Sequence, residues 1–177
     1  MDKTSKTCTI TGVSYDKLCR ILGENENEPS CIAFKKRLSN AIWQLHCSGV
    51  SDFWLNSERG IPMWAAEIIC GLKMYNAVGL HIAVPSETHN IDWSEDWRDR
   101  YYAVHEKADS VHIPRRTVED FEDFAGDSDS PSFHTDCDER MVDESDVVMI
   151  VGDESDCRHI ADYTGEQGVA VIYLRIE

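Results

Sequence analysis

Two hydrophobic periods alternate along this chain. Short apolar runs rich in β-branched and aromatic residues, such as residues 50–55 and 146–152, predict buried strands. Between these runs, apolar residues recur every three or four positions, as they do over residues 61–72, and this spacing predicts amphipathic helices. Strands that alternate with helices predict an α/β fold, with a parallel sheet covered by helices on both faces and right-handed crossovers.

The same patterns place the individual elements. Strands are predicted over residues 7–12, 50–55, 79–85, 110–113, 146–152 and 169–174. Helices are predicted over residues 15–22, 31–48, 61–76, 93–108, 138–144 and 157–166. The acidic residues 114–136 are expected to form a long loop, a length that usually signals function or mobility.

Length and charge narrow the class of protein. With 177 residues and a hydrophobic fraction of 42%, residues 1–177 are expected to fold as one domain. The net charge of −16 disfavours a nucleic-acid partner, because phosphate backbones require a positive surface. Residues 117–139 hold nine Asp and Glu and no Lys or Arg, so this segment is a candidate contact for a basic protein.

The cysteines and the hydropathy suggest a compartment. Seven cysteines, an odd number without a Cys-x-x-Cys pair, are typical of reduced thiols that pack as small hydrophobic side chains. The N-terminal residues precede no apolar run long enough for a signal peptide, and no stretch approaches the roughly 18 apolar residues of a membrane span. We therefore expect a cytoplasmic protein without a membrane partner.

The strand-end turns are the best candidates for a binding site. In an open parallel sheet the turns at residues 11–12, 56–60, 85–87 and 152–155 converge on one edge, where ligands of α/β proteins bind. Two interpretations are open: the four turns together line a nucleotide-sized pocket, or they are ordinary loops of an α/β fold. Neither Gly-x-Gly-x-x-Gly nor Gly-x-x-x-x-Gly-Lys occurs, which disfavours dinucleotide-dehydrogenase and P-loop functions.

Two acidic residues are candidates for chemistry in such a pocket. Glu67 lies within an apolar helix, where it is either a partner for ligand hydroxyls or a half-buried surface acid. Glu87 follows a strand. If both share one pocket, one carboxyl group would have a raised pKa and act as an acid or base. His134-x-x-Cys137 and Cys157-x-His159 would form a zinc site only if the two segments meet. Because these spacings differ from most structural zinc sites, no metal ligands are assigned.

Five motifs, in order along residues 7–176, resemble the YpsA-like family of the SLOG superfamily, to which DprA/Smf DNA-processing proteins and LOG phosphoribohydrolases belong. The motifs are Thr11-Gly12, Gly60-Ile61 with Trp64-Ala65-Ala66-Glu67, Pro85-x-Glu87, Trp93-x-x-x-Trp97-x-x-Arg100-Tyr101, and Met141-Val142-Asp143-x-Ser145-Asp146. The resemblance implies a three-layer Rossmann-like sheet with a nucleotide-derived ligand at the strand ends, and it brings no established reaction.

The chain departs from this family at four places. Val13-Ser14 replaces a His-Arg pair, Cys137-Asp138 replaces an Arg-Asn pair, and residues 56–62 lack two glycines and an acid of a Gly-Gly-x-x-Gly-x-Asp turn. A Gly-Gly-Thr turn is replaced around residues 155–157. Losing glycines and cations weakens the case for a bound phosphate. The phosphoribohydrolase signature Pro-Gly-Gly-x-Gly-Thr-x-x-Glu is absent as well.

Three functions follow as hypotheses. The first is a module that binds a nucleotide-like small molecule, with its cofactor, reaction and a homodimeric state left open. The second is a hydrolase of N-glycosidic bonds in nucleotides that uses Glu67 or Glu87. The third is an interaction protein that uses its acidic segment. The residues predicted near the ligand are Thr11, Gly12, Ser57, Gly60, Glu67, Glu87 and Ser145.

Overall fold

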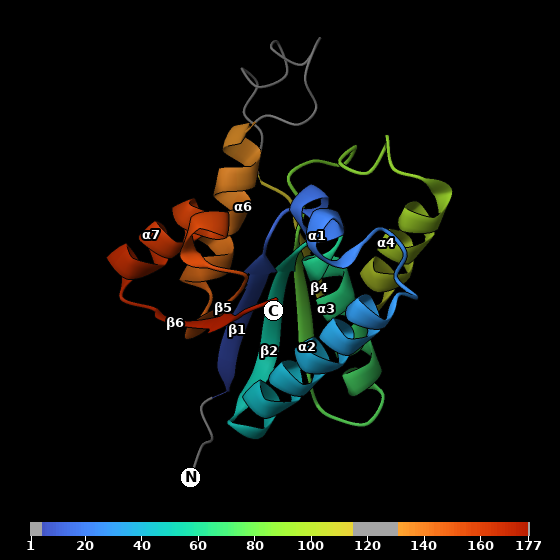
Figure 1. The fold of residues 1–177 in the computed structure, drawn as a ribbon. Helices are drawn as coiled ribbons and strands as arrows, with labels where there is room; N and C mark the ends of the chain where they lie inside the picture. Colours follow the sequence, from blue (N-terminus) through green and yellow to red (C-terminus); the bar gives the residue numbers. More distant parts are fainter. Residues whose placement is uncertain (1–4, 115–130, 177) are drawn as a thin grey trace, which may run out of the picture.

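Six strands form one sheet in which every neighbouring pair is parallel (Figure 1). The structure is a computed structural model, and it describes residues 5–114 and 131–176. The strands are β1 (Lys6–Gly12), β2 (Val50–Asn56), β3 (Gly79–Ala83), β4 (Ser110–His112), β5 (Val147–Val151) and β6 (Ala170–Leu174). The helices are α1 (Tyr15–Leu22), α2 (Pro29–Cys47), α3 (Ile61–Lys73), α4 (Glu95–Lys107), α6 (Pro131–Asp143) and α7 (Arg158–Gln167), with a short 3₁₀ helix η2 (Glu154–Cys157) before α7.

The strand order is β4-β3-β2-β1-β5-β6. The chain starts at β1, moves outward through β2 and β3 to β4, and then returns to the other side of β1 with β5. Because all pairs are parallel, every strand ends at the same edge of the sheet, which we call the carboxyl edge. It lies at the top of Figure 1. The predicted α/β, Rossmann-like arrangement is confirmed.

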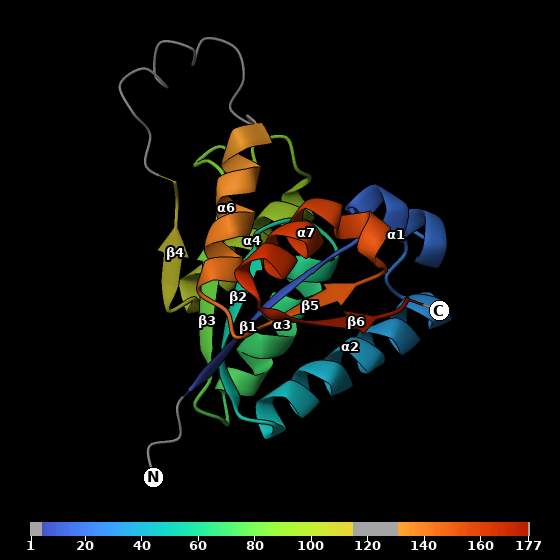
Figure 2. The same ribbon diagram turned by 90° about the vertical axis from the view of Figure 1, so that its left-hand side faces the viewer.

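Helices cover both faces of the sheet. Helices α2, α3 and α4 lie on one face, and α6 and α7 lie on the other (Figures 1 and 2). Strand β5 shows why its sequence is apolar throughout. Met149 and Val151 enter the core beneath the first face, whereas Val148 and Ile150 pack with residues of α6 and α7. A strand buried on both faces needs apolar residues at odd and even positions alike.

Helix α6 corrects the prediction of a loop over residues 114–136. The helix begins at Pro131 and includes residues that the sequence analysis assigned to the loop and to a shorter helix over residues 138–144. Proline is tolerated in a first helical turn, where its missing N–H has no intrahelical partner. Cys137 and Met141, four positions apart on one face, are buried with Trp54 and Ala83, so tertiary packing supports a helix whose sequence is largely polar. Residues 115–130 lie outside the described residues, so an interaction of the acidic segment with a basic partner stays a prediction.

All seven cysteines are free thiols, and most of them are shielded. Cys8, Cys31, Cys70 and Cys137 are buried, Cys19 and Cys157 are partly buried, and Cys47 is exposed. Burial raises the pKa of the Cys8 and Cys137 thiols to about 12, because a thiolate loses hydration there. The expectation that these residues mostly pack as small hydrophobic side chains therefore holds. Among the described residues, no helix has the length and apolarity needed to span a bilayer.

Candidate functional site at the carboxyl edge of the sheet

The carboxyl edge contains a topological switch point between β1 and β5. These two strands are neighbours, yet β1 continues into α1 and β5 continues into η2 and α7, which lie on different sides of the sheet (Figure 1). Connections that leave adjacent strand ends in opposite directions open a crevice between them, and ligands of open α/β sheets bind in such a crevice. The switch point is therefore the first place to examine for a site.

Two glycines allow the turns at this crevice to approach one another. A Cβ atom on Gly12 would lie 2.7 Å from the carbonyl oxygen of Val151. Gly152 has a φ of +124°, and a Cβ atom there would lie 2.6 Å from a carboxylate oxygen of Asp156. Larger residues would push the two turns apart. Both glycines thus shape the crevice, whether or not a ligand binds in it.

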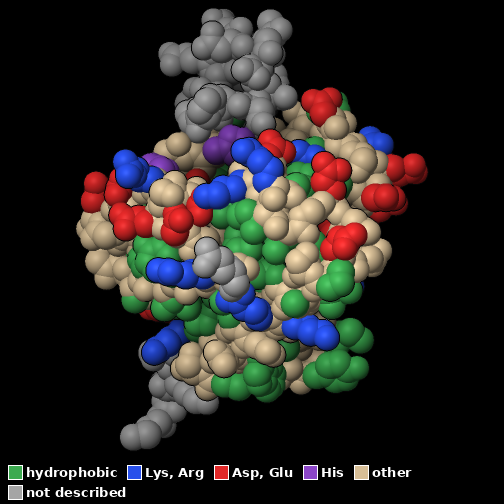
Figure 3. Space-filling view, viewed as in Figure 1, with side chains coloured by type: hydrophobic (Ala, Val, Ile, Leu, Met, Phe, Trp, Pro, Cys, Tyr) green, Lys and Arg blue, Asp and Glu red, His purple; other side chains and the backbone are tan. Residues whose placement is uncertain are grey.

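A hollow of about 300 Å³ opens above the ends of β1 and β2. It is lined by Thr11, Gly12, Ser14, Asn56, Asp138, Asp156, Cys157, Arg158, His159 and Ile160. A recess of about 150 Å³ beside it shares four of these residues and adds Val13, Tyr15, Glu58, Arg59 and Pro62. We call the two together the carboxyl-edge hollow. Figure 3 shows acidic, basic and histidine side chains mingled along this rim of the molecule.

Asp138 is the most perturbed acid in the hollow. Burial raises the pKa of this carboxyl group to about 6, because the charged form is poorly hydrated. His159 and His134 nearby and a hydrogen bond with Asn56 favour the charged form and partly offset the effect, whereas Glu58 adds to it. A carboxyl group with a pKa near 6 is protonated in a useful fraction of molecules close to neutral pH, so it can donate or accept a proton.

The turn after β5 is organised by acidic side chains. The side chain of Asp153 accepts a hydrogen bond from the backbone N–H of Ser155, at 2.9 Å, and the side chain of Asp156 accepts one from the N–H of Asp153, at 3.0 Å. Asp156 also forms an ion pair with Lys17 of α1. Where the family resemblance would place a glycine-rich phosphate cradle, this chain has an acid-capped turn in which the N–H groups of Asp153, Ser155 and Asp156 already have acceptors within the turn. The hollow therefore offers acceptors for hydroxyl and amino groups more readily than donors for a phosphate.

Four of the seven predicted ligand-binding residues lie at or near this edge. Thr11 and Gly12 line the hollow. Ser57 is buried in the turn after β2, and its hydroxyl has no hydrogen-bond partner among the described residues. Gly60 has a φ of +84° directly before α3, and a Cβ atom there would lie 3.0 Å from Leu18. Ser57 and Gly60 are therefore near the edge but are not among the residues that line the hollow, whereas Thr11 and Gly12 border its space.

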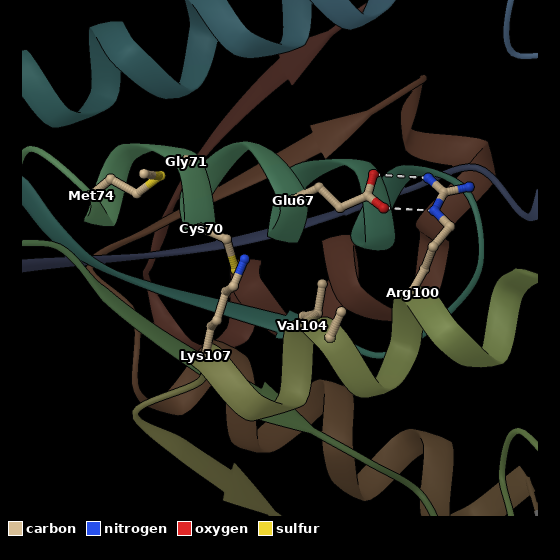
Figure 4. A pocket seen from close by; sticks show the side chains of 8 residues that line it. Glu67, Cys70, Gly71, Met74, Arg100, Val104 and Lys107 are labelled. Carbon is tan, nitrogen blue, oxygen red and sulfur yellow. Dashed lines mark hydrogen bonds and ion pairs between the residues drawn. The ribbon is translucent and has the colours of Figure 1, made fainter.

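Glu67 lies elsewhere, between α3 and α4 (Figure 4). Arg100 of α4 donates two hydrogen bonds to its carboxylate, from Nε at 2.6 Å and from Nη2 at 2.8 Å. Arg100 also donates to Glu26 at 2.7 Å. Glu67 lines a shallow cavity with Cys70 and Lys107 rather than the carboxyl-edge hollow. The structure therefore does not bring Glu67 together with Thr11 and Gly12.

The last two predicted residues are also separate from the hollow. Glu87 is exposed on the loop after β3 and is not among the residues that line it. Ser145 precedes β5, so it lies toward the opposite edge of the sheet. Its hydroxyl donates to the carbonyl oxygen of Met141 at 2.7 Å and lies 2.8 Å from the hydroxyl of Thr9. These contacts join α6 to β1. Glu67 and Glu87 do not share one pocket, so the condition set for an acid and base pair is not met.

Sequence reasoning missed Asn56, Asp138 and Asp156. Asn56 ends β2 and is the first residue of the turn at residues 56–60, although it was not among the predicted ligand-binding residues, and Asp156 lies one residue beyond the turn at residues 152–155. Both are polar residues at strand ends and could have been included on that basis. Asp138 gave no such signal, because it reaches the edge from α6, whose start the sequence pattern did not reveal.

One further group combines histidine and glutamate side chains. Ligand atoms of Glu58, His89 and His134 lie within 4.8 Å of one another, a combination that could hold a metal ion. The set of His134, Cys137, Cys157 and His159 weighed in the sequence does not assemble. Cys137 is buried between α6 and the sheet, and the Cys157 thiol donates to the carbonyl oxygen of Gly12.

Comparisons with known proteins identify a family for this chain. Residues 8–165 match the model of the YpsA family, described as the YspA SLOG family. UPF0398 protein BH1768 of Halalkalibacterium halodurans is 28% identical over 151 residues, which cover 84% of this chain and 73% of that protein. The UPF0398 protein of Staphylococcus aureus strain Mu3 is 23% identical over 150 residues, covering 84% of this chain and 74% of that protein.

The names of these relatives state no activity and no ligand. The family match nevertheless spans most of the chain and includes β1, β2, β3, β5 and most of α7. On that match, this chain belongs to the YpsA family of SLOG proteins.

Proposed function

We propose that the protein binds a nucleotide-derived small ligand in the carboxyl-edge hollow. The observation that carries this proposal is the position of the hollow, which is lined by the end of β1 and by η2 and α7, the elements that follow β5 at the switch point. A crevice at that point is where doubly wound sheets bind nucleotides, because loops from both sides of the sheet can reach one ligand. Its volume of about 300 Å³ is at the lower end for small-molecule sites, and the adjoining recess extends it.

The lining indicates which part of a nucleotide it would hold. Asp138, Asp156 and the side-chain oxygen of Asn56 are acceptors, which suit ribose hydroxyls or exocyclic amino groups. Arg158 is exposed at the start of α7 and supplies a cation at the rim. We therefore infer that the nucleoside part enters the hollow and that any phosphate stays near Arg158, toward solvent.

The test is a thermal-shift titration with NAD, ADP-ribose, nucleoside monophosphates and cyclic nucleotides. A ligand at 100 times its dissociation constant should stabilise the fold by about 2.7 kcal/mol, which is about 5 to 10 °C for a chain of this size. The shift should be lost in Asp138→Ala and weakened in Arg158→Ala. Glu67→Gln is the matched control, since Glu67 lies outside the hollow. A panel without any shift, or a shift that persists in Asp138→Ala, would refute the proposal.

A second candidate function is supported by the pKa of Asp138. A carboxyl group with a pKa of about 6 can protonate a leaving nucleobase at neutral pH, as hydrolysis of an N-glycosidic bond requires. On this hypothesis the acid is Asp138, in place of Glu67 or Glu87. The protein would then release free base from a bound nucleotide, which chromatography would detect. The Asp138→Asn variant would still bind the nucleotide but would release no base. Binding without release would leave the first proposal alone.

A further inference from the structure

Three side chains from distant parts of the sequence meet beside the carboxyl-edge hollow. Glu58 lies in the turn after β2, His89 in the loop after β3, and His134 in the first turns of α6. The carboxylate oxygen Oε1 of Glu58 is 3.3 Å from Nε2 of His89 and 3.5 Å from Nδ1 of His134. One oxygen thus lies close to both imidazole nitrogens.

These separations match a tetrahedral metal site. Zinc bound to nitrogen and oxygen ligands at about 2.0–2.1 Å holds neighbouring donor atoms about 3.3 Å apart. The two measured distances are 3.3 and 3.5 Å, and all three donor atoms lie within 4.8 Å of one another. An ion could therefore enter with small side-chain adjustments, without moving a helix or strand.

The surrounding structure shapes the turn that carries Glu58 and fixes the ring of His89. The backbone N–H of Glu58 donates to Oδ1 of Asn56, at 3.2 Å, and this bond shapes the turn after β2. The His89 side chain is only 3% exposed, and its ring packs edge-on against those of Trp93 and His134, with centroids 5.2 and 5.6 Å apart. A buried imidazole fixed between two rings is a preorganised ligand, which reduces the entropy lost when a metal binds.

We propose that Glu58, His89 and His134 bind one divalent transition-metal ion, with Zn²⁺ as the best match. Two imidazoles and one carboxylate are a ligand set of zinc sites that keep a coordination position open for water or a small molecule. Glu58 also lines the recess of the carboxyl-edge hollow, so the ion would lie next to the proposed ligand site. The metal site does not depend on the proposed function, since the protein alone supplies all three ligands.

A second histidine and glutamate pair provides an internal control. His159 of α7 and Glu139 of α6 approach to 3.6 Å, much as Glu58 approaches its two histidines. Their donor atoms belong to no group of three candidate ligands among the described residues. If a single His–Glu contact were enough to bind a metal, both places would bind. If three ligands are needed, only the first will.

The test is a titration of chelator-stripped protein with Co²⁺, whose visible spectrum reports tetrahedral coordination, followed by displacement with Zn²⁺. We expect one Co²⁺ per chain, displaced by Zn²⁺ and not by Mg²⁺, which prefers oxygen ligands. Glu58→Gln and His134→Ala should each weaken binding more than about tenfold. His159→Ala and Glu139→Gln should bind as the unmodified protein does.

His134 is the most informative position, because its side chain is 35% exposed and its removal should leave the fold intact. Circular dichroism of each variant verifies this. No bound metal, or equal affinity in His134→Ala and the unmodified protein, would overturn the proposal. The titration contains no nucleotide, so its result is separate from that of the ligand panel. Metal binding without a nucleotide shift would refute only the proposed function.

Discussion

The protein holds its acidic side chains in two contrasting settings. Between α2, α3 and α4, Glu26 and Glu67 share the guanidinium of Arg100, with three hydrogen bonds of 2.6 to 2.8 Å. Lys35 forms a further ion pair with Glu26. Each acid in this helix interface therefore has a permanent cation, and burial is tolerated because the charges are neutralised within the cluster.

The acids of the carboxyl edge are paired differently. The ion pairs of Glu58 are with two histidines, which are charged only if protonated. Asp138 has histidines and an amide as neighbours, and burial raises its pKa to about 6. An acid within an apolar helix can therefore be entirely structural. Acids that face titratable partners at a switch point can still exchange a proton with a ligand.

Removing the shared cation should produce the largest effect. Arg100→Met leaves Glu26 and Glu67 facing each other without a guanidinium, and we expect it to destabilise the fold by about 3 kcal/mol at pH 7, at the lower end of the range for buried pairs. Burial would raise the pKa of Glu26, but hydrogen bonds from Arg100 and Lys35 outweigh it, so the pKa is lowered from 4.5. A lowered carboxyl pKa contributes stability above its unfolded value and loses it as pH falls through the folded pKa.

The loss in Arg100→Met should therefore shrink as pH falls through the lowered pKa of Glu26, because a protonated carboxyl group no longer needs the cation. Urea unfolding at pH 7 and pH 3 measures this difference. An equal loss at both values would show that Arg100 acts through its packing over Trp97, where its guanidinium lies 4.2 Å from the ring centroid, rather than through charge.

A change of opposite sign is expected at the carboxyl edge. Asp138→Asn removes a charge that burial disfavours. The pKa is raised by about two units, and since each unit corresponds to about 1.4 kcal/mol we expect a gain of at most about 3 kcal/mol at pH 8. The pKa of Asp138 is raised from 3.8 to about 6, so its contribution to stability is full below pH 3.8 and is lost as pH rises through 6. The gain should therefore vanish at pH 3.5. Urea unfolding of both proteins across this range provides the measurement.

The matched control is the same kind of substitution in the helix interface. Glu67→Gln should lose about 1 kcal/mol at pH 8, because a neutral amide replaces one carboxylate of the Arg100 pair in a partly exposed position. Opposite signs for the two amide substitutions would support the contrast between the regions. If both variants lost stability at pH 8, Asp138 would be a structural acid and the hydrolase hypothesis would lose its basis.

The periodic parts of the sequence predicted the fold well. Residues 147–151, apolar at every position, favour a strand buried on both faces, and the strand–helix alternation then indicates a parallel sheet. The start of helix α6 was not predicted, because its first turns are polar. Its burial depends on contacts of Cys137 and Met141 with Trp54. Such contacts are made between distant segments and leave little trace in local sequence.

The candidate site was less predictable for the same reason. Thr11 and Gly12 could be located because a strand end is visible in sequence. Glu67 was placed correctly on its helix, but its pairing with Arg100 requires the relative position of α3 and α4. Glu58 and His134 are far apart in the sequence, with several helices and strands between them. Only the order of strands in the sheet brings them together.

The distribution of cysteines makes the protein suitable for attaching a reporter. Thiol reagents react with the thiolate, and burial keeps Cys8, Cys137 and Cys157, with pKa values raised to about 12, 12 and 11, in the unreactive form. Cys47, the exposed cysteine, ends α2 just before β2 begins, at the edge of the sheet opposite the hollow. A fluorophore or spin label on Cys47 would follow events at the hollow from the far end of the molecule, without entering the core or blocking the site.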